Sequence, residues 1–187
     1  MIHCLHTIPY LSRRSGGPAV STAGYAGGLA ELGCNVTVGS VRTDGAGSSV
    51  QLREGVELIE AKAVGGNGFR FSLSLKGRLR ECRRDVIHSH GLWTHVSYLS
   101  GKMAKKEDVP HVLAPCGMLQ EGALERSSWK KWIARRLFQD RVLKEADCLH
   151  AKSEAERRGI RRFGLKNPVA VVPMSQTSRR ICLGPVS

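Results

Sequence analysis

The feature that most constrains the fold of this chain is the regular alternation of short apolar runs with segments of helical character. Apolar runs of this length indicate buried strands. Strands that alternate with helices indicate a parallel sheet with helices on both faces. We therefore predict an α/β fold, a single domain built on a Rossmann-like, doubly wound parallel sheet. The expected strands are residues 2–8, 36–41, 56–63, 85–90, 109–114, 147–151 and 169–172.

Helices are expected between these strands, and two of them have clear start signals. Pro18 suits the first position of a helix, where its missing N–H costs no hydrogen bond. Ser153, with Glu156 three residues later, forms a capping box, and Gly164 suits the end of that helix. The expected helices are residues 18–32, 73–84, 93–105, 128–146 and 153–164.

The charge of the chain indicates the kind of partner it could bind. Its 187 residues include 29 Lys and Arg against 16 Asp and Glu, a formal net charge of +13. Such an excess favours nucleic acid, an acidic bilayer or phosphorylated small molecules as partners, but the charge taken alone is better explained by solvated helix faces. Aromatic residues make up only 5% of the chain, and no helix-turn-helix, RRM or zinc motif is present, so nucleic acid is not expected as a partner.

The sequence also bears on the cellular compartment. No apolar run approaches the ~20 residues of a membrane span. The N-terminus lacks a basic region followed by a long apolar stretch, so no signal peptide is expected. Six cysteines occur without a C-x-x-C pair, which fits reduced thiols. We predict a cytoplasmic location.

Gly16, Gly17 and Pro18 lie between the first expected strand and the first expected helix. Glycines let a backbone approach a ligand closely, and free N–H groups at a helix start attract anions. The loop could therefore contact a phosphate. It is neither a dinucleotide fingerprint nor a P-loop, and a tight strand-to-helix turn explains it equally well.

His88 and His90 lie two residues apart on an expected strand, so both point to the same face. His90 and Gly91 fall at the carboxyl end of that strand, where sites of doubly wound sheets lie. A metal would need a third ligand. His95 could be offered but no carboxylate lies near, so we predict no metal. A hydrogen-bonding or proton-transferring imidazole is favoured for His90 and a buried structural one for His88.

Cys116 and Gly117, within LAPCGMLQEGAL (residues 113–124), again follow the end of an expected strand. A cysteine there could act as a nucleophile. Since the sequence supplies no base paired with it, we expect an inert thiol or one adjacent to a ligand.

Together these segments resemble the N-terminal domain of family-4-like glycosyltransferases of the GT-B fold. The resemblance covers about residues 1–173 and depends on the order and spacing of the motifs. It implies that this domain is the N-terminal, acceptor-side half of a GT-B fold. The matching segments are GGPAVSTAGYAGGLAELGCNVTV, DVIHSHGLW, APCGML and ADCLHAKSEAERRGIRRFGL.

The resemblance also implies an activity and a site. Such enzymes transfer a sugar from a nucleotide-sugar donor to a glycan or lipid-linked acceptor, often a polysaccharide precursor. They need neither a metal nor any cofactor beyond the nucleotide sugar as co-substrate. Gly16 and Gly17 would face the donor phosphates, and His90 would be the catalytic residue at the cleft. Many relatives carry His or Arg at the position of Cys116, which puts a catalytic role there in doubt. The residues implied to line the cleft are Pro18, Gly91, Cys116 and Gly117.

Residues 174–187 depart from the family pattern. The family continues with a second Rossmann domain that holds the nucleotide sugar through an E-x7-E carboxylate pair. The segment MSQTSRRICLGPVS instead shows no strand or helix period. We expect an irregular tail of the kind that truncation or a frameshift produces, and a chain that is inactive or very slow alone. The alternative is a non-catalytic binding module that acts with a separate donor domain.

Residues 129–144, WKKWIARRLFQDRVLK, combine tryptophans and aliphatic residues with Lys and Arg. A basic amphipathic helix of this kind could dock on anionic lipid headgroups, so peripheral contact with the inner face of a membrane is one interpretation. An ordinary domain helix with its apolar side in the core is the other.

Overall fold

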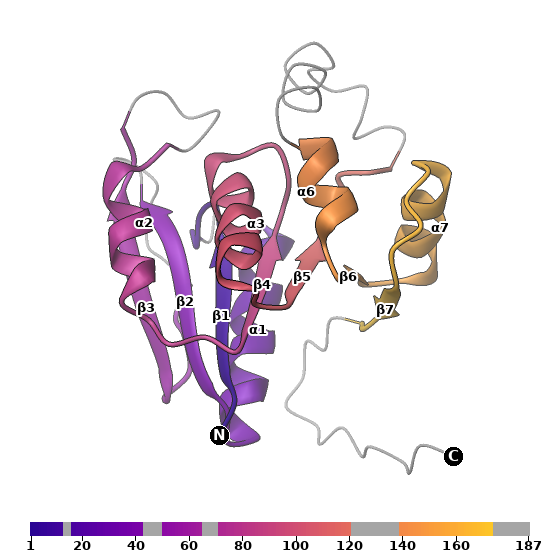
Figure 1. The fold of residues 1–187 in the computed structure, drawn as a ribbon. Helices are drawn as coiled ribbons and strands as arrows, with labels where there is room; N and C mark the ends of the chain where they lie inside the picture. The colour runs from indigo at the N-terminus through magenta and orange to yellow at the C-terminus, as the bar shows by residue number, and fades with distance from the viewer. Residues whose placement is uncertain (13–15, 43–49, 65–70, 121–138, 174–187) are drawn as a thin grey trace.

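The computed structural model describes residues 1–12, 16–42, 50–64, 71–120 and 139–173 (Figure 1). These residues form a sheet of parallel strands flanked by helices. The strands are β1 (His3–Ile8), β2 (Asn35–Arg42), β3 (Val56–Lys62), β4 (Val86–His90), β5 (His111–Ala114), β6 (Cys148–Ala151) and β7 (Val169–Val171). The helices are α1 (Gly17–Glu31), α2 (Leu73–Arg80), α3 (His95–Glu107), α6 (Asp140–Glu145) and α7 (Glu154–Arg162).

The sheet has seven strands in the order β3-β2-β1-β4-β5-β6-β7, all parallel. The chain runs outward from β1 to β3, returns to the other side of β1, and then runs outward again from β4 to β7. β1 and β4 are therefore hydrogen-bonded neighbours where the direction reverses. The predicted Rossmann-like, doubly wound sheet is confirmed.

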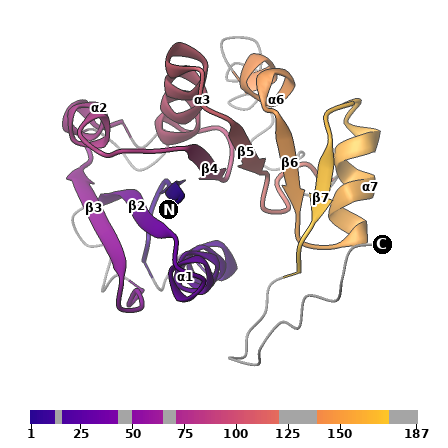
Figure 2. The same cartoon turned by 60° about the horizontal axis from the view of Figure 1, so that its bottom comes forward.

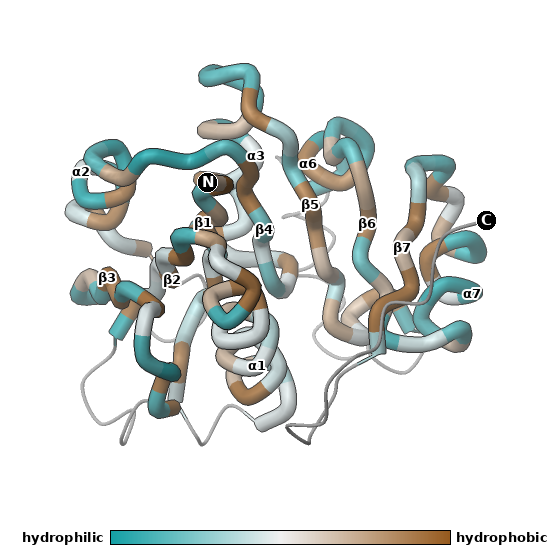
Figure 3. The backbone as a smooth tube through the Cα atoms, turned by 90° about the horizontal axis from the view of Figure 1, so that it is seen from below, coloured by the Kyte–Doolittle hydropathy of each residue, from teal (hydrophilic) through white to brown (hydrophobic). Residues whose placement is uncertain are grey.

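Helices lie on both faces of the sheet, with α1 on one face and α2, α3 and α6 on the other (Figure 2). Alternate residues of β1 supply both cores. Cys4 and Ile8 pack under α1, whereas Leu5 packs under α2 and α3. A third core joins β5 and β6 to α6 and α7 and includes Leu113, Leu149, Leu143 and Ile160. α7 is otherwise mostly hydrophilic (Figure 3). Among the described residues, no helix is long and apolar enough to cross a bilayer.

Several predicted helix boundaries differ from the structure by a few residues, and one of these differences has a clear local reason. The helix expected from residue 93 begins at His95, because Trp93 has a φ of 64° and the Thr94 hydroxyl caps the helix by accepting from the Ser97 N–H at 3.3 Å. α2 ends at Arg80 instead of residue 84. The helix expected at 128–146 is described only as α6, and the rest of it, with most of the basic segment 129–144, lies outside the described residues.

The central strands should dominate stability. Leu113 on β5 is 0% exposed, so Leu113→Ala removes buried methyl groups and leaves a cavity, which costs about 2–5 kcal/mol. Leu73→Ala is the matched control, because that side chain is 73% exposed. Urea unfolding measures both. Equal midpoints for the two variants would contradict the described core.

Candidate functional site

The turns that follow β1, β4 and β5 lie at the carboxyl edge of the sheet and contain residues in the left-handed region. Gly16, Gly91 and Gly117 have φ of 70°, 84° and 77°. Cys116 has a φ of 54°, which is unfavourable for a side chain with a Cβ. Strained backbone of this kind collects at functional sites.

These turns are close together. A Cβ added at Gly91 would lie 3.7 Å from the Cγ of Pro9, which follows β1, and 3.6 Å from the Cε of Met118, which follows β5. The Leu92 N–H also points to the Met118 sulfur at 3.2 Å. The structure therefore brings Gly91 and the Cys116–Gly117 turn together, as parallel strand order predicts for the carboxyl ends of neighbouring strands.

Gly16 precedes α1, and Gly17 and Pro18 are its first two residues. Pro18 is thus one place later in the helix than the sequence indicated, still within the first turn, where backbone N–H groups lack partners in the helix. A Cβ at Gly17 would meet no described atom within 4 Å. Packing against the described residues therefore does not require glycine at this position, and the space next to it is open.

Four histidines from three strands form a connected group on the α1 face. His6 on β1 is paired in register with His88 on β4, and its Nδ1 lies 3.0 Å from Nε2 of His90. His88 Nε2 lies 3.1 Å from Nδ1 of His150 on β6, and His150 Nε2 lies 3.0 Å from the Val172 carbonyl oxygen.

The Val172 carbonyl determines which ring nitrogens of His150 and His88 carry a proton. A carbonyl only accepts, so His150 Nε2 carries the proton that it donates to Val172, and His150 Nδ1 accepts from His88 Nε2–H. Tyr25 on α1 covers the group. Its hydroxyl donates to the same Val172 oxygen at 3.1 Å, and its ring stacks on His90 with centroids 6.4 Å apart.

Burial keeps these imidazoles neutral. It lowers the pKa of His6 to about 4, with the charge of His150 as a second cause. Burial is also the main reason that the pKa of His90 lies well below its usual value, and His88 adds to the effect. His90 is 1% exposed and its Nδ1 has no partner among the described residues, nor does Nε2 of His6.

The histidine group contains a third possible metal ligand beside His88 and His90, namely His6, which the sequence did not indicate. One ring nitrogen from each of His6, His88 and His90 lies within 4.8 Å of the other two, so these residues could together hold a metal ion. However, the trio contains no carboxylate, and the charge of Lys152 acts on both His88 and His90. Both features oppose a cation, and the absence of a metal from the mechanism stays our prediction.

A second polar group lies where β6 ends. Lys152 reaches α1, and its Nζ donates to Ser21 Oγ at 2.7 Å. Half of the capping box predicted at Ser153 and Glu156 is observed: Ser153 Oγ accepts from the Glu156 N–H at 3.2 Å, whereas the Glu156 carboxylate bonds the residue before Ser153. Glu156 Oε2 accepts from the backbone N–H of Lys152, at 2.8 Å. Burial raises the pKa of Cys116 and the Lys152 charge opposes this, so Cys116 is a thiol and not an activated thiolate.

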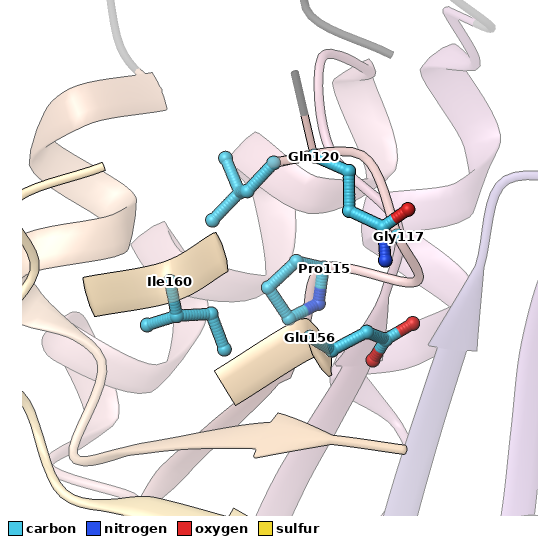
Figure 4. Close-up of a pocket in the computed structure, with 6 residues that line it drawn as sticks. Pro115, Gly117, Gln120, Glu156 and Ile160 are labelled. Carbon is cyan, nitrogen blue, oxygen red and sulfur yellow. The ribbon is translucent and has the colours of Figure 1, made fainter. Parts of the chain in front are cut away.

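A shallow hollow that is open to solvent lies beside this group. Pro115, Leu119 and Ile160 form its apolar wall, and the Glu156 and Gln120 side chains reach its rim near Gly117 (Figure 4). The arrangement could hold the edge of a ligand that combines an apolar surface with hydroxyl groups.

The buried histidines should make stability depend on pH. An unfolded histidine titrates near pH 6.5, whereas His6 in the folded chain titrates near 4. Between these values the unfolded state binds more protons, so stability is complete above pH 6.5 and falls as the pH is lowered towards 4. The difference for His6 alone is about 3 kcal/mol at pH 4. Urea unfolding from pH 7 to pH 4 tests this, with His6→Gln expected to flatten the slope. The contradicting result is an equal slope in both proteins.

Comparisons with known proteins agree with this fold. Residues 16–174 match the family model described as a glycosyl transferase 4-like domain. Sucrose-phosphate synthase from Thermosynechococcus elongatus is similar in structure, with a TM-score of 0.64 and 14% identity over 92% of this chain and 48% of that one. The Anabaena protein HepE in complex with UDP and glucose is also similar, with a TM-score of 0.59 and 11% identity over 93% of this chain and 44% of that one.

This chain therefore spans about half the length of these structures, and identities this low show a shared fold alone. No curated protein sequence matches the chain significantly. The family match covers most of the chain and includes every segment on which the predicted site depends. The chain belongs to the glycosyl transferase 4-like domain family.

Proposed function

We propose that this chain forms the acceptor-side half of a glycosyltransferase that moves a sugar from a nucleotide-sugar donor to a glycan or lipid-linked acceptor. The observation that supports the proposal most strongly is that three turns lie at one edge of the sheet, with Pro9 and Met118 both next to Gly91. These turns follow β1, β4 and β5, beside the reversal of strand order where doubly wound folds bind ligands.

In this proposal the backbone does much of the binding. Gly16 and Gly17 present free N–H groups to the donor phosphates, because the helix start carries partial positive charge. Pro18 holds the first turn of α1 in place. Gly91 and the Cys116–Gly117 turn line the proposed cleft, and all three residues have left-handed backbone conformations.

His90 is the proposed catalytic imidazole, but its ring is buried and must become accessible before it can act on a substrate. A ring that is 1% exposed and covered by Tyr25 cannot touch a sugar in the described conformation. Direct action of His90 therefore requires Tyr25 to move when substrate binds. A neutral imidazole can accept a proton from an acceptor hydroxyl, which suits the neutral form that burial favours.

The 187 residues on their own are proposed to provide half of the cleft. The two similar structures are about twice as long, and HepE was solved with UDP and glucose. We propose that tight donor binding needs a second domain, and that residues 174–187, which lie outside the described residues, do not replace it. The alternative proposal is a non-catalytic module that pairs with a separate donor domain, and it also requires a second domain for tight donor binding.

A cytoplasmic location and peripheral contact with an anionic membrane also stay proposals. The location rests on the N-terminal sequence and on cysteines without a C-x-x-C pair, whereas the membrane contact rests on residues 129–144, of which only 139–144 are described. Salt-sensitive sedimentation with anionic liposomes, and none with neutral ones, would support the membrane contact. Equal sedimentation with both would count against it.

The proposed function predicts that the chain alone transfers sugar very slowly and that a donor-binding partner domain raises this rate. The purified 187-residue chain should hydrolyse or transfer nucleotide sugars at background rate. Addition of a donor-binding domain from a related enzyme should raise transfer to acceptor above that background. Radiolabelled sugar transfer measures both. Robust turnover by the chain alone would contradict the half-cleft, and binding of donor and acceptor without any turnover in the mixture would favour the non-catalytic module.

A further inference from the structure

Lys152 is the first residue after β6, and its side chain crosses from that strand end to α1. Its Nζ donates to Ser21 Oγ at 2.7 Å, while Ser21 Oγ donates its own proton to the Pro18 carbonyl oxygen at 3.1 Å. The hydroxyl therefore turns a lone pair to the ammonium. Ser21 lies four residues after Gly17, about 6 Å along the helix axis, since each residue of an α-helix rises ~1.5 Å.

Within the part of the chain that the structure describes, the Lys152 ammonium has no carboxylate partner. The ion pairs formed among the described residues do not include it. The nearby Glu156 uses Oε2 to accept from the backbone N–H of Lys152, not from Nζ. The Lys152 side chain contacts the Ser21 hydroxyl and the Cys116 thiol, and both of these groups are uncharged.

Arg84, another cation that is largely buried, differs from Lys152 because it is paired with a carboxylate. Its side chain is 7% exposed, and it donates to Glu107 Oε2 at 2.7 Å. A partly buried charge without a counter-ion is costly, so an unneutralised cation needs a reason. Lys152 is partly buried and lies at the edge of the sheet where the ligand is expected.

We propose that Lys152, together with the Ser21 hydroxyl, binds a phosphoryl group of the substrate. The inference rests on the proposed function, since both a nucleotide-sugar donor and a lipid-phosphate acceptor carry such a group. A lysine suits it because its ammonium is a compact charge with three N–H donors, of which Ser21 and Cys116 engage two. The bound phosphoryl oxygen takes the third and supplies the missing negative charge.

The test is a calorimetric titration of the full 187-residue chain with inorganic pyrophosphate at low salt. Lys152→Met should weaken binding about tenfold or more, because a charge-assisted hydrogen bond is lost. Lys102→Met is the matched control. It removes the same charge from an exposed position on α3, on the other face of the sheet, and should leave affinity almost unchanged. Lys152→Arg should restore part of the affinity.

Ser21→Ala is a second, smaller change at the same site and should weaken binding without removing charge. Thermal melts establish that each variant is folded. Equal affinity of the folded Lys152→Met and wild-type chains would overturn the inference, and so would the absence of pyrophosphate binding by wild type at millimolar concentration. Neither result decides whether the chain transfers sugar, because the transfer assay with a donor domain is read separately.

Two further titrants distinguish the source of the phosphoryl group. If the group belongs to the donor, uridine diphosphate should lose affinity in Lys152→Met while a short polyprenyl phosphate binds both proteins equally. If it belongs to the acceptor, the pattern reverses. Equal binding of both titrants to the two proteins would also overturn the inference.

Discussion

The parallel pairing of β1 with β4 is the interaction on which the rest of this structure depends. It joins the two halves of the sheet at the point where the chain reverses its outward path. It brings the turns after both strands to one edge, so that a Cβ added at Gly91 would lie 3.7 Å from the Cγ of Pro9. Its register also sets His6 beside His88. Both the glycine turns and the histidine group are thus consequences of one strand pairing.

The edge and the interior of the site have opposite electrostatic character. In the interior, burial keeps His6 and His90 neutral, and one nitrogen of each ring is used in the hydrogen bond between them. At the edge, the start of α1 and the Lys152 ammonium both favour negative charge. The α1 start and the Lys152 ammonium would favour a phosphate at this edge, while the Glu156 carboxylate near Gly117 would favour a hydroxyl group. The strained φ of Cys116 lies at this edge. Such strain persists only where the surrounding structure enforces it.

Much of the fold could be predicted because its signals are local. The apolar runs gave the strands, and Ser153 with Glu156 gave the start of α7. Site residues were predicted only where a glycine or histidine lies at or beyond the carboxyl end of a strand, as at Gly16, His90 and Gly117. His6, Tyr25, His150, Ser21 and Lys152 were missed because each meets its partners through pairing between distant segments. Tyr25 and Val172, for example, are 147 residues apart in the chain. One signal was available in hindsight, since His6 and His150 occupy the same alternating face of their strands as His88.

The central claim is that the carboxyl edge beside the β1–β4 pairing binds the activated end of a sugar donor. Two-dimensional amide NMR of the labelled chain, titrated with uridine diphosphate, tests this claim directly and detects weak binding. We expect the largest shifts at the amides of Gly16, Gly17, Gly91 and Gly117, and almost none on α3. Shifts confined to α2 or α3, or none at millimolar ligand, would contradict the account.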